Sequence, residues 1–287
     1  MNKKLLAQYG LKWNPFSPEI PVEGLAVTPP LDNFCHRLET LAREGGFALV
    51  SGDPGSGKSS ALRVLVDRLG KLQDLRVGIF SRPQSRLHDF FREMGELFGV
   101  ELSPHNRWAG TKVLRERWQT HVETALYRAI IVVDEAQETP ASVLNELRLL
   151  ASVDLDSRIL LTVVLAGDSR LTAKLRGEDL LPLGSRIRVR FNLEPQGSVA
   201  LAKCLHHVLE TAGNAGLMTE ELVSTLADHS AGNLRVLMTL ASDLLVTAAE
   251  RNLARLDEKL FLEVFAPAKP VATERDSAAA GARRGRR

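Results

Sequence analysis

Cysteines are scarce and long apolar runs are missing, and these two absences exclude several classes of protein. Cys35 and Cys204 are the only cysteines in 287 residues, and they lie in unrelated segments without the spacing of metal ligands. This usage fits a reducing compartment and argues against a structural disulfide. No apolar run approaches the ~18 residues that span a bilayer, and residues 1–10 lack the apolar core of an export signal. We therefore expect a soluble protein of the bacterial cytoplasm, without a membrane partner.

A strong net charge is also missing. The formal net charge is +2, so no overall field favours a polyanionic partner. The charge is uneven, however, because the segment from Ala266 to the end carries six basic and two acidic residues. This segment is rich in Ala, Pro and Gly, and we predict a disordered basic tail over residues 267–287. Contact of the remaining chain with nucleic acid would have to use a local stripe of Arg and Lys.

The most specific motif that is present is a phosphate-binding loop, GDPGSGKS, of the form G-x-x-x-x-G-K-[ST]. Such a loop brings backbone N–H groups close to an anion, and we predict positive φ at its three glycines. Lys58 is predicted to reach the β- and γ-phosphates, and the Ser59 hydroxyl to ligate Mg²⁺. The predicted nucleotide contacts are Gly52, Asp53, Pro54, Gly55, Ser56, Gly57, Lys58, Ser59 and Ser60.

The segments on either side of this loop support the motif. Residues 47–50 form a short apolar run typical of a strand, and residues 60–69 predict a helix with apolar side chains on one face. The N-terminus of that helix would point at the phosphates. A Gly-rich turn that only resembles the motif is the alternative, and the strand before and helix after it disfavour that alternative. The sequence therefore predicts that the chain binds a nucleoside triphosphate.

Apolar strands alternate with helices as far as residue 193, which argues for an α/β fold with a mostly parallel sheet covered on both faces. We predict a cap at Asp32 for the first helix of this part. The predicted strands are 47–50, 75–80, 129–133, 159–165 and 187–191, and the predicted later helices are 198–212, 219–229, 232–250 and 257–265. The predicted domains are an extended N-terminal arm (1–30), a nucleotide-binding α/β domain (31–193), a small all-helical domain (194–266) and the tail.

Two acidic residues, Asp134 and Glu135, end the strand that we expect to lie beside the phosphate loop. In that position an aspartate holds the Mg²⁺ shell and the following glutamate polarises the attacking water. Acidic residues at strand ends are common in ordinary loops, so the pair depends on the upstream phosphate loop for its interpretation. With that loop present, we predict catalytic roles for both.

Three further residues are candidates for contacts to the triphosphate. Asp168 follows a predicted strand, where it would either contact the γ-phosphate and water or cap the next helix. Arg186 begins an alternation of arginines that share one strand face, and this face is either a solvated edge or the source of an arginine finger for a neighbouring subunit. Arg235 lies in the first turn of an apolar helix, where a cation is unfavourable unless an anion such as phosphate compensates.

These segments together resemble AAA+ ATPases. The resemblance rests on GDPGSGKS, IIVVDEAQE, LLTVVLAGDSRL, LGSRIRVRF and GNLRVL, covers residues 8–265, and is strongest for the ExeA-like and TnsC/TniB/IstB-like ATP-binding proteins of bacterial secretion or transposition. It implies a P-loop AAA+ domain with a five-stranded sheet and a helical lid, and Mg²⁺-dependent ATP hydrolysis at a site shared between subunits.

Carried over by position, the resemblance makes Asp134 the magnesium acid, Glu135 the hydrolytic base, Arg186 the finger and Arg235 the lid sensor. The segment Asn14-Pro15-Phe16 resembles the part of such proteins that packs near the base. Asp168 departs from the family pattern, because Asn, Ser or Thr is usual in the first sensor.

The function implied by the resemblance is ATP-dependent regulation of DNA transposition. Such a protein oligomerises as a ring or helical filament on double-stranded target DNA, recruits or activates a DDE-type transposase, and disassembles on hydrolysis. Candidate contacts to the DNA backbone are Arg82, Arg86, Arg107 and Lys112, with an ordinary solvated face as the alternative. The rival function is that of an ExeA-like ATPase in secretion or envelope assembly. Since those proteins also carry a membrane span and a periplasmic module, which we do not expect here, the first function is favoured.

Overall fold

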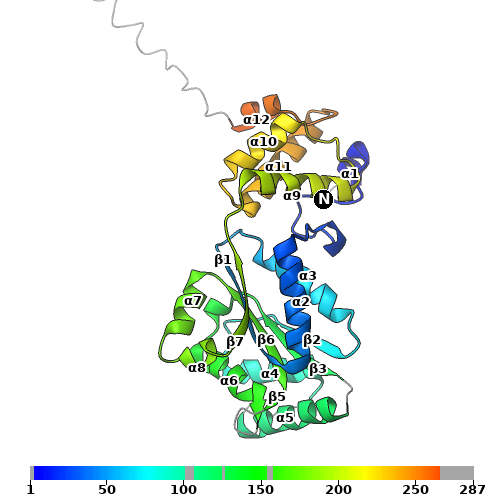
Figure 1. The fold of residues 1–287 in the computed structure, drawn as a ribbon. Helices are drawn as coiled ribbons and strands as arrows, with labels where there is room; N and C mark the ends of the chain where they lie inside the picture. Colours follow the sequence, from blue (N-terminus) through cyan, green and yellow to red (C-terminus); the bar gives the residue numbers. More distant parts are fainter. Residues whose placement is uncertain (1–2, 101–106, 125–126, 154–157, 266–287) are drawn as a thin grey trace, which may run out of the picture.

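The structure, a computed structural model, describes residues 3–100, 107–124, 127–153 and 158–265. It has an α/β domain and a helical lid joined by a short linker, with the lid above the sheet edge where the strands end (Figure 1). The predicted basic tail lies outside the described residues. Among the described helices, none combines the length and apolar character needed to cross a membrane.

Five strands form one sheet in the order β2-β3-β6-β1-β7, and all neighbours are parallel. Their bounds are β1 Gly46–Gly52, β2 Leu75–Phe80, β3 Arg128–Val133, β6 Leu161–Gly167 and β7 Ile187–Leu193. The predicted parallel sheet is therefore confirmed. The predicted strand at 159–165 is divided, because Arg158–Ile159 (β5) pairs antiparallel with Ser152–Val153 (β4) and β6 begins only at Leu161.

Helices cover both faces of the sheet because successive strand side chains point to opposite faces. Ala48 and Val50 of β1 pack into one core and Phe47 and Leu49 into the other. The first face carries α2 Pro29–Glu44 and α3 Lys58–Gly70; the second carries α4 Leu87–Phe98, α5 Arg107–Glu123, α6 Ala141–Ala151, α7 Ser169–Arg176 and α8 Leu181–Gly184, with the short η2 Ala136–Glu138 before α6. The sheet is buried on both sides, as the continuous apolar strands indicate.

The first helix of the α/β domain begins earlier than predicted. Thr28, not Asp32, caps α2, because its hydroxyl accepts a hydrogen bond from Leu31 N at 3.4 Å. Two prolines in the first turn suit a helix start, since the N–H groups there have no helical partner. Asp32 instead accepts a hydrogen bond from Arg68 of α3 at 2.6 Å and so ties the two helices together.

The N-terminal arm is not wholly extended, because Lys3–Tyr9 forms a helix, α1, that we did not predict. A helix this short has little stability of its own and depends on tertiary packing. Tyr9 supplies that packing by joining the lid core, which Phe16 and Ile20 farther along the arm also join. After α1 the arm is irregular except for one 3₁₀ turn, η1 Val22–Gly24. The arm is thus built onto the lid.

The lid contains the four helices that the sequence predicts, each within two residues of the predicted bounds. They are α9 Ser198–Ala212, α10 Glu220–His229, α11 Leu234–Glu250 and α12 Glu258–Phe265. Their apolar faces meet in a core with Leu205, Leu222 and Leu244 fully buried. The linker from β7 is held to the turn before α11, where Gln196 N donates to Gly232 O at 3.1 Å.

Candidate nucleotide-binding site

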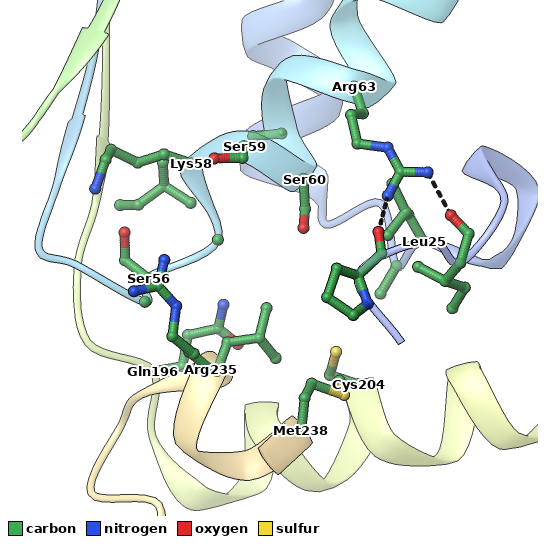
Figure 2. A pocket seen from close by; sticks show the side chains of 18 of the residues that line it. Leu25, Ser56, Lys58, Ser59, Ser60, Arg63, Gln196, Cys204, Arg235 and Met238 are labelled. Atoms are coloured by element: carbon green, nitrogen blue, oxygen red, sulfur yellow. Dashed lines mark hydrogen bonds between the residues drawn. The ribbon is translucent and has the colours of Figure 1, made fainter. Parts of the chain in front are cut away.

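A cavity of about 710 Å³ lies between the α/β domain and the lid. The phosphate loop and α3 form one side of it, and the arm, α9 and α11 form the other (Figure 2). Its volume is within the range of ligand pockets. The lining residues used below are Pro15, Phe16, Pro54, Gly55, Ser56, Lys58, Ser59, Ser60, Arg63, Cys204, Arg235 and Met238.

The glycines of the phosphate loop act in two different ways. Gly55 and Gly57 have φ of +85° and +100°, which favours glycine as predicted. Gly52 does not have positive φ, so that part of the prediction is wrong. It is limited by space instead, because a Cβ there would lie 2.6 Å from Ser56 Oγ and 2.7 Å from Leu193 O. Gly57 also precedes α3, so the helix N-terminus faces the loop.

Polar groups gather inside this loop. Lys58 is only 6% exposed, and its Nζ donates to Gly52 O at 2.9 Å and Asp53 O at 3.0 Å. Ser56 Oγ is buried and has no hydrogen-bond partner among the described residues. A bound phosphate oxygen would satisfy this hydroxyl, and the ammonium and helix N-terminus favour an anion. These groups fit a nucleotide phosphate.

Asp134 reaches the phosphate loop although its strand is not the neighbour of β1. We expected the end of this strand to lie beside the phosphate loop, and it does so although β6 lies between β3 and β1 in the sheet. The ends of parallel strands meet at one edge of the sheet, and across this edge Ser59 Oγ donates to Asp134 Oδ2 at 3.0 Å. A hydroxyl and a carboxylate oxygen side by side are hard ligands that suit Mg²⁺. These two residues would hold the metal.

Glu135 follows in a conformation that non-glycine residues seldom adopt, with φ of +50°. Such a backbone costs on the order of 1–3 kcal/mol and is concentrated at functional sites. Its exposed side chain accepts a hydrogen bond from Gln137 Nε2. Gln137 is buried, and its Oε1 accepts from Asp168 N at 3.4 Å. Gln137 therefore connects Glu135 to the end of β6, a role we did not predict although the residue lies in the DEAQ segment.

Asp168 shows the capping contact, one of the two interpretations left open by the sequence. Its carboxylate accepts from Arg170 N at 2.9 Å at the start of α7 and forms an ion pair with the Arg170 guanidinium at 2.9 Å. The hydrogen bond from this guanidinium lowers the pKa of Asp168 below its ordinary value. Asp168 also lines the cavity, and contact with the γ-phosphate stays a prediction.

Arg235 faces the phosphate loop from the lid. It lies in the first turn of α11, lines the cavity, and extends its guanidinium toward Ser56 (Figure 2). The structure thus brings together Lys58, Ser59, Asp134, Glu135 and Arg235, contributed by three separate segments of the chain.

Arg186 lies where the strands of the sheet begin, at the end opposite to the phosphate loop. It precedes the first residue of β7, whereas Leu193 at the other end of this strand pairs with Gly52. A strand of this length spans about 20 Å, which is too far for an arginine side chain to bridge. Arg186 therefore does not reach the phosphate loop of its own chain. β7 is an edge strand, and Arg188 on it pairs with Glu44 at 2.9 Å.

The arm supplies part of the cavity wall, with one exception to the prediction. Pro15 and Phe16 line the cavity, but Asn14 is not among its lining residues. Asn14 Oδ1 accepts from Phe16 N at 3.1 Å and thereby shapes the turn that presents the next two residues. The arm is fixed to α3 by Arg63, whose guanidinium donates to Pro18 O at 3.0 Å and to Ile20 O (Figure 2). We did not predict this role for Arg63.

The lid completes the cavity with soft, weakly polar side chains. Cys204 of α9 and Met238 of α11 face the space across from Ser59 and Ser60 (Figure 2). Burial raises the pKa of the Cys204 thiol to about 11. Together with Phe16, this part of the cavity suits the flat apolar face of a nucleotide base.

The four residues predicted to contact DNA are not among the described residues that line the cavity, and acidic side chains lie close to Arg82 and Lys112. Arg82 and Arg86 are exposed after β2, but a hollow at Arg82 is also lined by Asp89, Glu93 and Glu96. Lys112 is exposed on α5 and pairs with Glu116 at 3.7 Å. The side chain of Arg107 lies outside the described part of the structure. DNA binding by these residues stays a prediction.

Comparison with known proteins agrees with this geometry. Residues 41–175 match the family model described as an AAA domain. A curated relative, general secretion pathway protein A of Aeromonas hydrophila, is 29% identical over 211 residues, or 72% of this chain and 38% of the relative. The chain thus spans about two fifths of the length of that relative.

Solved structures with a similar fold include two archaeal proteins. Cdc6p of Pyrobaculum aerophilum superposes with a TM-score of 0.67 at 16% identity, over 84% of this chain and 67% of that one. The ORC1 protein of Aeropyrum pernix, solved in complex with DNA, gives 0.62 at 21% identity, over 87% and 67%. At these identities the likeness concerns the fold. The chain accordingly has the P-loop AAA+ fold, and residues 41–175 are the part that matches the AAA-domain model.

Proposed function

We propose that this protein binds and hydrolyses ATP with Mg²⁺. The observation that carries the proposal is the hydrogen bond between Ser59 Oγ and Asp134 Oδ2, because Ser59 and the adjacent Lys58 line a cavity large enough for a nucleotide. Mg²⁺ bound by these two oxygens would neutralise charge on the phosphates. Lys58 and Arg235 add positive charge on two sides of the same space.

In the proposed reaction, water attacks the γ-phosphorus while the bond to the β–γ bridging oxygen breaks, giving ADP and phosphate. The Glu135 carboxylate orients this water and accepts its proton. In the structure one oxygen of that carboxylate is engaged by Gln137. This hydrogen bond restricts the orientation of the Glu135 carboxylate.

We infer that Arg186 acts on the nucleotide of a neighbouring subunit. Its position at the far end of β7 from the phosphate loop supports action in trans rather than in cis. An arginine at such a site offsets charge that develops in the transition state. The protein would then work as a homo-oligomer, a ring or a helical filament.

The test of hydrolysis uses Glu135→Gln, which keeps the shape of the side chain and removes its basicity. We expect ATP affinity within about twofold of wild type and turnover lower by at least about 100-fold, measured by single-turnover hydrolysis with Mg²⁺. Unchanged turnover would remove Glu135 from the mechanism. Mixing Arg186→Ala with Glu135→Gln subunits then tests the shared site, because active mixed sites require Arg186 and Glu135 from different chains.

For the cellular role, we propose ATP-dependent regulation of DNA transposition in the cytoplasm, with double-stranded DNA and a DDE-type transposase as partners. The DNA in the Aeropyrum pernix ORC1 structure supports a role on DNA for this fold, as does the resemblance of the motifs to transposition helpers. Arg82, Arg86, Arg107 and Lys112 would contact phosphates, so binding would be salt-dependent and tolerant of sequence.

A second candidate function is that of an ATPase in secretion or envelope assembly. The 29% identity to general secretion pathway protein A supports it. The two functions differ in what induces assembly. Electron microscopy with a slowly hydrolysed ATP analogue should show rings or filaments that require DNA if the first is correct. Assembly that requires lipid vesicles and ignores DNA would favour the second.

A further inference from the structure

The start of α11 contacts the phosphate loop directly. Asn233 Nδ2 donates to Pro54 O at 3.0 Å, and Arg235 N donates to Gly55 O at 3.2 Å. The approach is close enough that a Cβ on Gly55 would lie 2.2 Å from Asn233 Oδ1. The contact therefore depends on glycine in the loop and on asparagine in the lid.

The oxygen and the nitrogen of the Asn233 side-chain amide make different contacts. Oδ1 caps α11 by accepting from Arg235 N at 3.0 Å and Val236 N at 3.2 Å. Nδ2 makes the bond that crosses from the lid to the loop. A cap requires only an oxygen acceptor, so serine or aspartate would satisfy the helix. The donor on Nδ2 has no function in capping.

Before α11, the chain is held at a second point. Gly232 has φ of +82°, and its carbonyl accepts from Gln196 N in the linker between the two domains. The turn that carries Asn233 is thus tied to the linker on one side and to the phosphate loop on the other. A change in loop conformation would consequently be transmitted to the lid at this turn.

We propose that Asn233 is a positioning residue that couples occupancy of the phosphate loop to docking of the lid. The proposal rests on the proposed nucleotide binding. A phosphate-binding loop turns N–H groups toward its anion, and Asn233 and Arg235 N bind carbonyls of the same loop. Peptide groups that are bonded at both ends polarise one another, so the two events favour each other. By reciprocity, the lid contact strengthens nucleotide binding as much as nucleotide strengthens lid docking.

The same contact positions Arg235. Its backbone N–H is shared between Asn233 Oδ1 and Gly55 O, while its guanidinium extends into the cavity. Loss of the Asn233 bond would therefore loosen a cation of the site as well as the loop. Arg63 fixes the arm to α3 on another side of the cavity, so the arm and lid contact the nucleotide-binding segment at two separate points.

The experiment compares Asn233→Ser, Asn233→Asp and Asn233→Ala with wild type. Serine and aspartate keep the cap but lose the Nδ2 donor, whereas alanine loses both. We expect Asn233→Ser to unfold at the wild-type temperature without nucleotide and to bind ADP about fivefold to tenfold more weakly. Asn233→Asp should bind still more weakly, because an acceptor would face Pro54 O and add negative charge near the phosphates. Asn233→Ala should also unfold at a lower temperature.

Calorimetric titration with ADP and thermal unfolding with and without ADP give the two measurements. Wild-type ADP affinity in Asn233→Ser would overturn the coupling and leave Asn233 as a cap alone. A weaker affinity that is matched by an equal loss of stability without ADP would also overturn it. Lys58→Ala separates this result from failure of the proposed function: if wild type and Lys58→Ala both fail to bind ADP, nucleotide binding itself is wrong.

Discussion

The two walls of the cavity are built in opposite ways. The phosphate-loop wall is one continuous stretch whose glycines, lysine and serines follow one another in the chain. The opposite wall is assembled from the arm, α9 and α11, which are separated by up to about 220 residues in sequence, and Phe16, Cys204 and Met238 meet there only in the folded protein. The first wall offers charge and N–H groups, and the second offers mainly apolar surface, with the Arg235 guanidinium as a charged group.

This difference predicts a division of labour between the walls. The phosphate-loop wall should decide whether any nucleotide binds, because charge-assisted hydrogen bonds to phosphate are the strong contacts. The arm-and-lid wall should set the affinity for the nucleotide and the preference for its base, because the free energy of apolar contact is proportional to the buried area. Variants in the two walls should therefore differ in kind as well as in size.

The largest effect is expected for Lys58→Ala. Removal of the ammonium takes away a charged donor from the phosphates, and we expect affinity for ADP and ATP to fall by about 100-fold or more. Isothermal titration would measure the loss. Lys71→Ala is a matched control, since Lys71 is exposed on the other end of the same helix segment and pairs with Asp67. Retained affinity in Lys58→Ala would contradict the hypothesis that charge in the phosphate-loop wall decides whether a nucleotide binds.

Phe16→Ala is expected to have the next largest effect. Phe16 is 5% exposed, belongs to the lid core and lines the cavity. Truncation of a buried phenylalanine costs about 3 kcal/mol or more of unfolding free energy, which denaturant unfolding would detect. We also expect ADP affinity to fall more than affinity for inorganic triphosphate, because only ADP has a base. An equal loss for both would contradict the assignment of this wall to the base.

A smaller effect is expected for Arg63→Ala. The variant releases Pro18 O and Ile20 O from α3, so the arm is no longer fixed to the cavity wall. We expect KM for ATP to rise about fivefold with kcat nearly unchanged, measured by steady-state hydrolysis. Arg43→Ala provides a control, because Arg43 is an exposed arginine that pairs with Asp74 outside the cavity. A fall in kcat with unchanged KM would be the opposite of this expectation.

The smallest effect concerns the reactivity of Cys204. Burial raises its pKa from 9.0 to about 11, so at pH 8 the thiolate fraction is about 100-fold lower than in an ordinary thiol. In a Cys35→Ala background we expect slow alkylation at pH 8, faster reaction as the pH rises toward 11, and protection by ADP. Alkylation at the rate of a free cysteine, unaffected by ADP, would place Cys204 outside the nucleotide cavity.

The strands and helices were largely predictable because their apolar periodicity is local. The parallel sheet and the four lid helices follow the predicted pattern, and Lys58, Ser59, Asp134, Glu135 and Arg235 come together as expected. Helix α1 was missed because its stability comes from packing against the lid rather than from its own sequence.

Contacts between distant segments were less predictable. β6 lies between β3, which precedes Asp134, and β1, which precedes the phosphate loop. The order of strands in a sheet cannot be predicted from the sequence of a single strand. Asn14 does not line the cavity but accepts a hydrogen bond from Phe16 N, while Arg63 of α3 holds the arm through Pro18 O. A polar side chain forms hydrogen bonds with the groups that lie close to it, and the tertiary structure determines which groups these are.

The sequence by itself determined most of the phosphate-binding loop, because the positive φ of Gly55 and Gly57, the charge of Lys58 and the hydroxyl of Ser59 follow from the order of eight neighbouring residues. The tertiary structure decided which groups lie around that loop. Asn233 and Arg235 contact it directly, and Phe16, Cys204 and Met238 line the rest of the cavity. These groups meet because the arm and the lid share one core. Burial of that shared apolar surface drives their assembly.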